Sequence, residues 1–249
     1  MSIAFTPNSS GLGVSSSSTI AITDSCTWLF WMKPISYAVK GSQRRIFQYV
    51  NLSSPTANAL HLMWNNTQTA VNGGIRLGFQ RNFVTTDLLR FDSSGIPFGE
   101  WTPVAITYNG NSASTGCRIF WGGTETAVYQ SSQNGVGAPR PTLGNLYLGN
   151  ISSEGRDIDA LITNFCIINQ ILSDNMILRW AKDGMATIPT SYVSVSSNVL
   201  AQWFYQNEFS DGSLVTNSGG VIDWSGNGNH ASPFPNQPTY RAEEVLSYP

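Results

Sequence analysis

Hydrophobic and polar residues alternate along most of the chain, which is the pattern of half-buried β-strands. Residues 26–32 (CTWLFWM) depart from this alternation, because large apolar side chains occupy both faces. A strand with two apolar faces is expected at the centre of a sheet that is covered on both sides. The pattern therefore predicts a central strand here, with the side chains of Trp28 and Phe30 buried together with that of Ile106.

Other segments with strand-like patterns follow one another along the chain, and Gly- and Asn-rich turns separate them. These segments are residues 2–5, 45–50, 59–64, 75–80, 88–91, 102–108, 117–121, 124–129, 146–148, 161–168 and 199–205. The pair Gly122-Gly123 joins two of them with the two-residue spacing of a tight hairpin. This succession predicts an all-β fold, an antiparallel two-sheet jelly-roll sandwich, and does not indicate βαβ units.

One short helix is predicted on the surface of the sandwich. Ser173 is a suitable N-cap, Ile177 and Trp180 belong to an apolar stripe, and Gly184 can end the helix.

The residue composition of the chain changes near residue 187. We therefore divide it into a sandwich of residues 1–186 and a segment of residues 187–249, which holds a final strand and an arm rich in Gly, Asn and Pro. Pro233, Pro235 and Pro238 stiffen this arm. Its aromatic residues Phe234, Tyr240 and Tyr248 are expected to pack either on the chain's own sandwich or on a neighbouring subunit, and the two alternatives are equally weighted.

The order of several segments resembles a known family. Residues 27–34 (TWLFWMKP), 99–110 (GEWTPVAITYNG) and 146–150 (LYLGN) are similar to successive strands and turns of laminin G-like (LamG-type) jelly rolls, which are concanavalin A-like lectin domains. The resemblance spans roughly residues 2–184. Residues 200–203 followed by 223–230 (DWSGNGNH) resemble a segment that usually precedes such a jelly roll, whereas here it follows one. The resemblance implies a fold and a general capacity to bind glycans or proteins, but no particular ligand.

Charged residues make up only 11% of the 249 residues, and the net charge is −2. No basic cluster occurs, so nucleic acid is not an expected partner. No apolar run is long enough for a membrane span, and the residues after Met1 do not read as a secretory signal. Cys26, Cys117 and Cys166 lie inside apolar strand patterns and are expected to be buried free thiols.

Three tryptophans beside turn residues are candidate platforms for sugar rings, which stack on exposed aromatic faces: Trp64, Trp121 and Trp224. Asp223, Ser225 and Asn227 place oxygen atoms at alternate positions, which is half of a calcium-loop pattern. The acidic residue that would complete the pattern is missing, because Phe234 stands in its place. Calcium is the one candidate cofactor, and an Asx turn is the alternative interpretation of the same residues.

The sequence does not favour catalysis. Glycan cleavage needs two carboxylates that flank the scissile bond, and the nearest pair is Asp157 and Asp159. The two histidines, His61 and His230, are distant in sequence and lack a nucleophile motif. We therefore expect a protein that binds and does not catalyse.

A lectin-like sandwich without an export signal, with unpaired cysteines and few charges, has the features expected of a component of a particle that is assembled in a host cytoplasm. The leading hypothesis is a structural or adhesion protein of a phage-like virion, acting as a capsid decoration, a head fibre or a tail-associated module. Its expected partners are other virion proteins, further copies of itself and host-surface glycans. The alternatives are a free carbohydrate-binding lectin and, less favoured, a glycan-cleaving enzyme.

Overall fold

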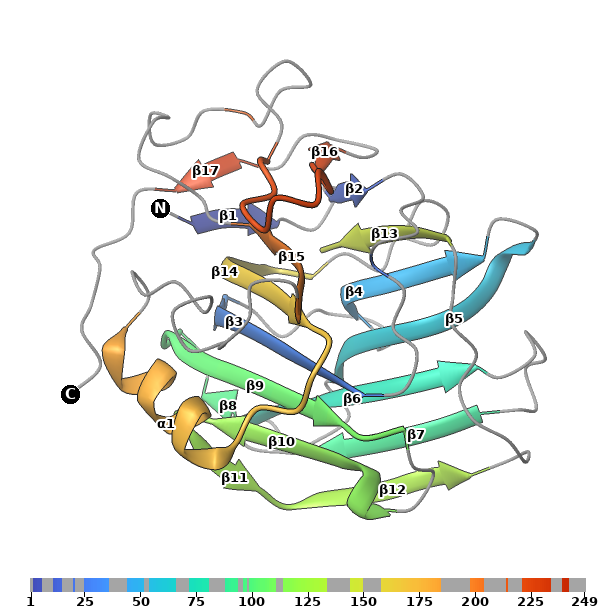
Figure 1. Ribbon diagram of the computed structural model, residues 1–249, viewed down its shortest axis with the longest axis vertical. Helices are drawn as coiled ribbons and strands as arrows, with labels where there is room; N and C mark the ends of the chain where they lie inside the picture. Colours follow the sequence, from blue (N-terminus) through green and yellow to red (C-terminus); the bar gives the residue numbers. More distant parts are fainter. Residues whose placement is uncertain are drawn as a thin grey trace.

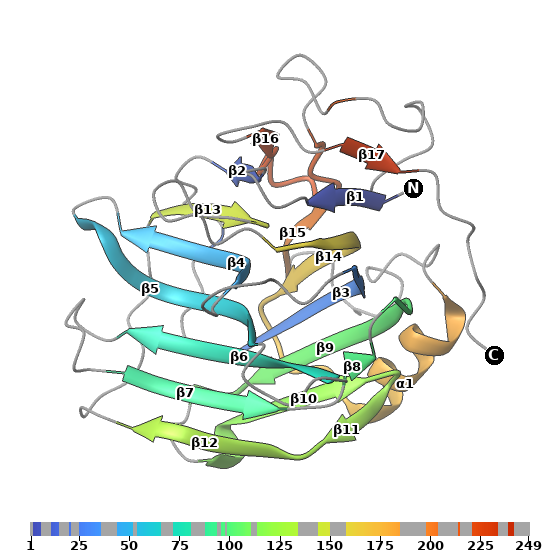
Figure 2. The ribbon, with the colours of Figure 1, turned by 180° about the vertical axis from the view of Figure 1, so that it is seen from behind.

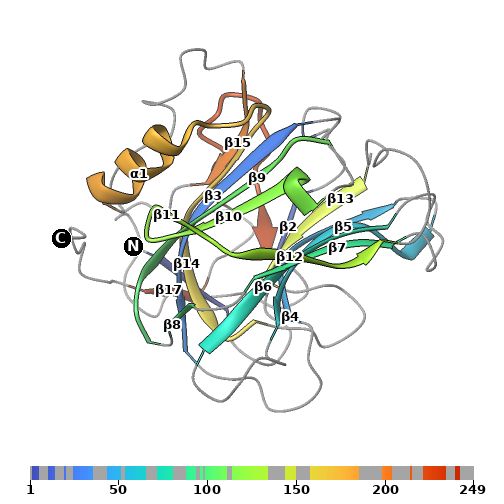
Figure 3. The same cartoon turned by 90° about the horizontal axis from the view of Figure 1, so that it is seen from below.

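The computed structural model contains two antiparallel β-sheets that face each other, with a helix on the outer side of one of them (Figures 1 and 3). This arrangement confirms the predicted antiparallel sandwich. The structure describes residues 2–5, 11–14, 20, 25–35, 44–51, 54–65, 72–80, 88–93, 96–97, 99–110, 114–133, 144–149, 158–184, 198–203, 214, 221–233 and 239–241.

The first sheet carries the helix on its outer face. Its strands, in spatial order, are β11 (Thr124–Thr126), β10 (Cys117–Trp121), β9 (Thr102–Tyr108), β3 (Cys26–Pro34), β14 (Ala160–Ile168), β1 (Ser2–Phe5) and β17 (Thr239–Arg241), and β15 (Val199–Trp203) also pairs with β14. All pairings among these strands are antiparallel.

The second sheet lies in front when the molecule is seen from behind (Figure 2). Its strands, in spatial order, are β12 (Val128–Gln133), β7 (Leu88–Ser93), β6 (Asn72–Gln80), β5 (Ser54–Asn65), β4 (Arg44–Asn51), β13 (Gly144–Leu148), β2 (Leu12–Val14) and β16 (Ser232–Pro233). The short strand β8 (Ile96–Pro97) pairs with β6, and a 3₁₀ turn, η2 (Ser114–Gly116), precedes β10.

Strand β3 occupies the predicted central position, between β9 and β14. The side chains of Trp28, Phe30 and Ile106 are fully buried between the two sheets, as the sequence pattern predicts. On the opposite face of β3, Leu29 and Trp31 belong to a separate cluster beneath the helix. The two apolar faces of this strand therefore serve two hydrophobic cores, one inside the sandwich and one outside it.

The helix α1 (Asp174–Asp183) begins and ends as predicted. The hydroxyl of its N-cap, Ser173, accepts a hydrogen bond from the backbone N–H of Met176, and Gly184 is the C-cap. Its buried residues include Trp180, whose ring lies 6.0 Å from that of Trp31 between ring centroids. The apolar stripe thus attaches the helix to the outer face of the first sheet.

The predicted hairpin at Gly122-Gly123 is present, with φ of 59° and 82° at the two glycines, as a tight hairpin turn with left-handed residues requires. The prediction of one strand over residues 124–129 is wrong. The segment divides at Ala127 into β11, which pairs with β10 of the first sheet, and β12, which pairs with β7 of the second. It therefore closes one edge of the sandwich by passing from sheet to sheet (Figure 3).

The opposite edge of the sandwich contains strands from the N-terminal and the C-terminal segments of the chain. Strands β1 and β15 lie end to end along the same edge of β14, and Asn164, with φ of 52°, lies at the irregularity between the two pairings. Strand β16 pairs with β2, and β17 pairs with β1. Strands β15, β16 and β17 thus pair with the sandwich of their own chain, whereas Phe234 and Tyr248 lie outside the described residues.

We expect Gly149→Ala to destabilise the protein far more than Gly226→Ala. Both glycines have a left-handed backbone, with φ of 80° and 86°, which costs an L-residue about 1–2 kcal/mol. A Cβ at Gly149 would collide with the ring of Phe5, whereas one at Gly226 would meet nothing within 4 Å. Thermal or urea unfolding measures the difference, and equal losses in the two variants would contradict the close packing of Gly149 on Phe5.

Candidate functional site

Residues 223–230 form a loop whose conformation is fixed by the carboxylate of Asp223. Its Oδ1 accepts hydrogen bonds from the backbone N–H groups of Gln202 and Ser225, both at 2.9 Å. Its Oδ2 accepts from the hydroxyl of Ser225 and from the backbone N–H of Asn229, both at 2.8 Å. The carboxylate is 5% exposed, so these four hydrogen bonds replace the water that an exposed carboxylate would bind.

The same loop covers the outer edge of β15. The backbone N–H of Trp224 donates to the carbonyl of Gln202 at 2.8 Å. The side-chain amide of Asn227 donates to the carbonyls of Val199 and Leu200, and the side-chain amide of Asn229 also donates to Leu200. These bonds satisfy edge carbonyls that could otherwise pair with another chain.

The indole of Trp224 is the large aromatic side chain that this loop presents to solvent. It is 47% exposed, and its apolar neighbour Ile222 is 50% exposed, while Asp223 between them points inward. The exposed ring of His230 receives a hydrogen bond at Nδ1 from the backbone N–H of Asp223, at 3.1 Å. An acceptor at Nδ1 assigns the ring proton to Nε2, which is a donor.

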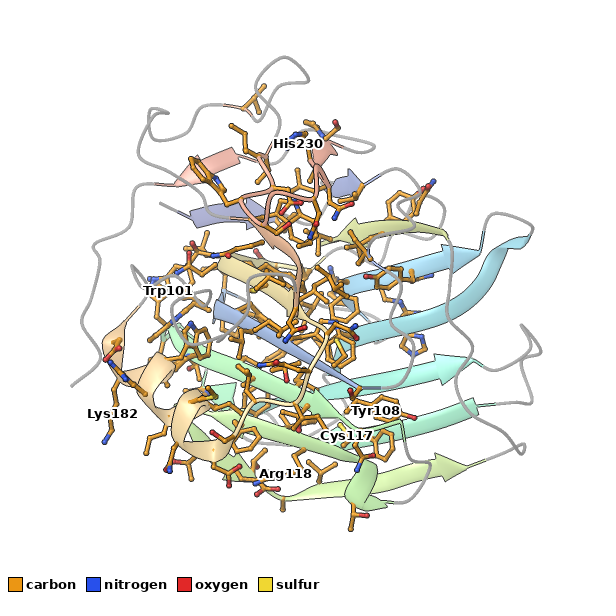
Figure 4. The ribbon with its side chains drawn as sticks, in the orientation of Figure 1. Trp101, Tyr108, Cys117, Arg118, Lys182 and His230 are labelled. Atoms are coloured by element: carbon orange, nitrogen blue, oxygen red, sulfur yellow. The ribbon has the colours of Figure 1, made fainter. Side chains whose placement is uncertain are left out.

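The loop lies near the edge of the sandwich that contains β1, β2, β16 and β17, as the position of His230 shows (Figure 4). Its conformation depends on the sandwich beneath it. The indole N–H of Trp203, a fully buried residue of β15, donates to the carbonyl of Asn229 at 2.9 Å. The exposed indole of Trp224 thus stands on a segment held at both ends by buried polar bonds, which limits the conformational freedom that a ligand would otherwise have to reduce.

The expectation that Trp64 is a surface platform is wrong. Trp64 follows Leu62 by two positions on β5, so both side chains point into the sandwich, and the indole is only 2% exposed. Trp121 is half-buried and packs against the interior cluster, because it shares the inward face of β10 with Ile119. Of the three candidate tryptophans, Trp224 alone presents a large part of its ring to solvent.

The geometry of Asp223, Ser225 and Asn227 matches an Asx turn and does not fit a calcium site. The N–H of Ser225 donates to Oδ1 of Asp223, which is the bond that defines such a turn. N–H and O–H donors point at both carboxylate oxygens, where a cation would have to bind, and the amide of Asn227 faces backbone carbonyls. Within the part of the chain that the structure describes, His, Cys, Asp and Glu side chains form no group of three or more that could hold a metal ion.

The positions of the other residues considered for chemistry are as follows. Asp157 lies outside the described residues, and Asp159 is half-buried. His61 is buried on β5, far along the chain from the exposed His230.

Cys26, Cys117 and Cys166 are buried free thiols, as predicted, and burial raises the pKa of each one well above its ordinary value. They are therefore protonated and unreactive at neutral pH.

Sequence reasoning missed the structural roles of Asn229, His230 and Trp203 in this loop. The Asp223–Gln202 bond joins residues that lie 21 positions apart, so no local pattern contains it. The one available signal was the density of Asn, Ser and Asp residues, whose side chains commonly bond to nearby backbone.

The two facing sheets, the outer helix and the side-chain-stabilised rim loop define a lectin-like jelly-roll sandwich. The model of the concanavalin A-like lectin/glucanases superfamily, of the laminin G type, matches residues 7–178. The match covers more than half of the chain, so the chain belongs to this superfamily. No curated protein matches the chain.

Several solved structures share the fold at low sequence identity. A putative carbohydrate binding protein from Bacteroides ovatus is 12% identical with a TM-score of 0.62, and the match covers 99% of this chain but 61% of that one. A heptameric SAP-like pentraxin from Limulus polyphemus is 14% identical with a TM-score of 0.52, covering 72% and 81% of the two chains. The binding domain of the Paraclostridial Mosquitocidal Protein 1 is 9% identical with a TM-score of 0.51, covering 72% and 45%.

We expect Asp223→Asn to lower the free energy of unfolding by about 2–4 kcal/mol, because an amide nitrogen would then face N–H donors that now bind a carboxylate oxygen. The matched control is Asp183→Asn, which changes an exposed carboxylate at the end of α1 and should cost less than about 0.5 kcal/mol. Chemical denaturation of both variants tests the comparison. An Asp223→Asn variant as stable as its control would show that the carboxylate does not fix the loop.

Proposed function

We propose that this protein binds glycans and has no catalytic role of its own. The observation that carries the proposal is the half-exposed indole of Trp224 on a loop that the buried Asp223 carboxylate holds in place. A sugar ring can stack its C–H face on such an indole, and a preformed platform reduces the loss of conformational entropy on binding.

Polar groups on the same loop as the indole support recognition of a hydroxylated ligand. The rings of Trp224 and His230 and the side chain of Asn227 are all exposed on the same short loop. Binding sites of this kind combine an apolar face with a few fixed polar groups that orient the ligand. The fold is also that of a putative carbohydrate binding protein from Bacteroides ovatus, which is consistent with the proposal.

The broader setting that we propose is a virus-like particle of the phage type, in which copies of this chain act as adhesion or decoration proteins. Three buried thiols that form no disulfide fit assembly in a reducing cytoplasm. A surface with few charges can meet neighbouring copies and virion proteins without desolvating many ions. The described part of the chain contains no helix with the length and apolarity needed to cross a membrane. The alternative is a free lectin, which would use the same Trp224 loop but would not be bound to other proteins of a particle.

We expect Trp224→Ala to weaken binding to the best glycan on a neutral glycan array by about tenfold or more, equivalent to about 1.4 kcal/mol. Ile222→Ala is the matched control, because it removes an apolar side chain of similar exposure directly before the loop, and this side chain has no ring face. Isothermal titration with that glycan measures both variants. Full affinity in Trp224→Ala would exclude the stacking site.

The particle setting predicts that the chain copurifies with intact virions. Immunogold electron microscopy of particles from the source should label a capsid or tail position with an antibody against this chain. The label should be lost from particles in which its gene is deleted. Unlabelled particles, together with glycan binding by the isolated chain, would favour the free lectin.

A further inference from the structure

A pocket lies at the far end of the molecule from the Trp224 loop, where β11 leaves the first sheet and β12 joins the second. Figure 4 shows Arg118, which lines this pocket, and His230 of the loop at opposite ends of the sandwich. The pocket has a volume of about 590 Å³, which is in the range of about 300–1,000 Å³ typical of small-molecule sites. Its wall includes Thr115, Arg118, Glu125, Thr126, Ala127 and Val128.

The guanidinium of Arg118 is held by two carboxylates at once. Its Nε and Nη2 donate to the two carboxylate oxygens of Glu125 at 2.9 and 2.6 Å. Its Nη1 and Nη2 donate to the two carboxylate oxygens of Asp174, both at 2.8 Å. The carbon of the guanidinium lies 4.9 Å from the ring centroid of Phe120. Two bidentate pairs and an aromatic face fix the orientation of these charged groups.

The hydrogen-bonding capacity of this cluster is not exhausted. A guanidinium has five N–H donors, and the four bonds to Glu125 and Asp174 leave one donor on Nη1. Each oxygen of Glu125 accepts one bond from Arg118 and can accept another. Arg118 and Glu125 both line the pocket, so its wall combines a donor group and an acceptor group with the apolar side chains of Ala127 and Val128.

The charge of the cluster selects among ligands. One guanidinium and two carboxylates leave one net negative charge, and hydrogen bonds from Arg118 lower the pKa of Asp174, so that its carboxylate is ionised at neutral pH. An anionic ligand in the pocket would lie beside a cluster with net negative charge, whereas hydroxyl groups can both donate to Glu125 and accept from Arg118.

We infer that this pocket is a second ligand site, which binds an uncharged sugar residue through its hydroxyl groups. Such a ligand matches the mixture of donors, acceptors and apolar wall better than a carboxylated sugar does. The inference rests on the proposed function for its ligand class, but it concerns a separate surface with residues of its own.

Two variants separate this pocket from the Trp224 loop. Ala127→Trp places a large ring in the pocket at an exposed position, and Lys182→Trp adds the same ring at an exposed position of α1 as a control. The probe is an array of neutral and carboxylated glycans, titrated for dissociation constants with wild type, Ala127→Trp, Lys182→Trp and Trp224→Ala. Circular dichroism and melting temperature show which variants are folded. If Ala127→Trp does not fold, Thr115→Trp blocks the pocket from another exposed position.

We expect a subset of neutral glycans to lose at least tenfold in affinity for Ala127→Trp while Lys182→Trp and Trp224→Ala retain them. Retention of every neutral glycan by the folded pocket variant would overturn the inference. The inference would also be overturned if the glycans lost in this variant were carboxylated and not neutral. If the inference fails in this way but Trp224→Ala still loses affinity for other glycans, the proposed function is retained. If wild type binds no glycan, both proposals fail.

Discussion

The aromatic rings that meet at Phe165 join the two sheets and the C-terminal segment into one structure. The ring of Phe165 stacks on that of Phe30 in the first sheet, with centroids 5.3 Å apart, and meets Phe47 of the second sheet edge-on at 5.6 Å. Trp203 of β15 lies 6.0 Å from it. Aromatic pairs of this kind contribute about 0.5–1.5 kcal/mol beyond the burial of their area. Phe165 therefore couples parts of the chain that are far apart in sequence.

The candidate glycan site depends on this interior, although it lies on the surface. Trp203 packs against Phe165 with its ring and donates its indole N–H to the carbonyl of Asn229. The carboxylate of Asp223 binds the backbone of Gln202, the neighbour of Trp203. The loop that presents Trp224 is thus an extension of the core, and its rigidity follows from buried contacts and not from the loop sequence alone.

Local patterns were sufficient to predict much of the fold. Short apolar runs with two buried faces located β3 and β9, and the capping residues Ser173 and Gly184 gave the bounds of α1, because these signals act within a few residues. The passage of residues 124–133 from one sheet to the other was not visible, since the change of sheet is set by partners on β10 and β7.

The site was harder to predict than the fold for the same reason. Trp64 precedes two asparagines, which suggested a surface position. It is buried because it lies two residues after Leu62 on β5 and therefore faces the same side of the sheet. The oxygen-rich spacing after Asp223 suggested calcium, whereas the donors that occupy this carboxylate include backbone groups of Gln202 and Asn229, which composition does not reveal.

Hydrogen exchange measured peptide by peptide tests the coupling through Phe165 most directly. Peptides that cover β14 and β15 should share the slowest exchange in the protein and should become exposed together, because both strands belong to the same interior. Rapid exchange of residues 199–203 alongside a slowly exchanging β14 would contradict the account, since the C-terminal segment would then not be part of the sandwich core.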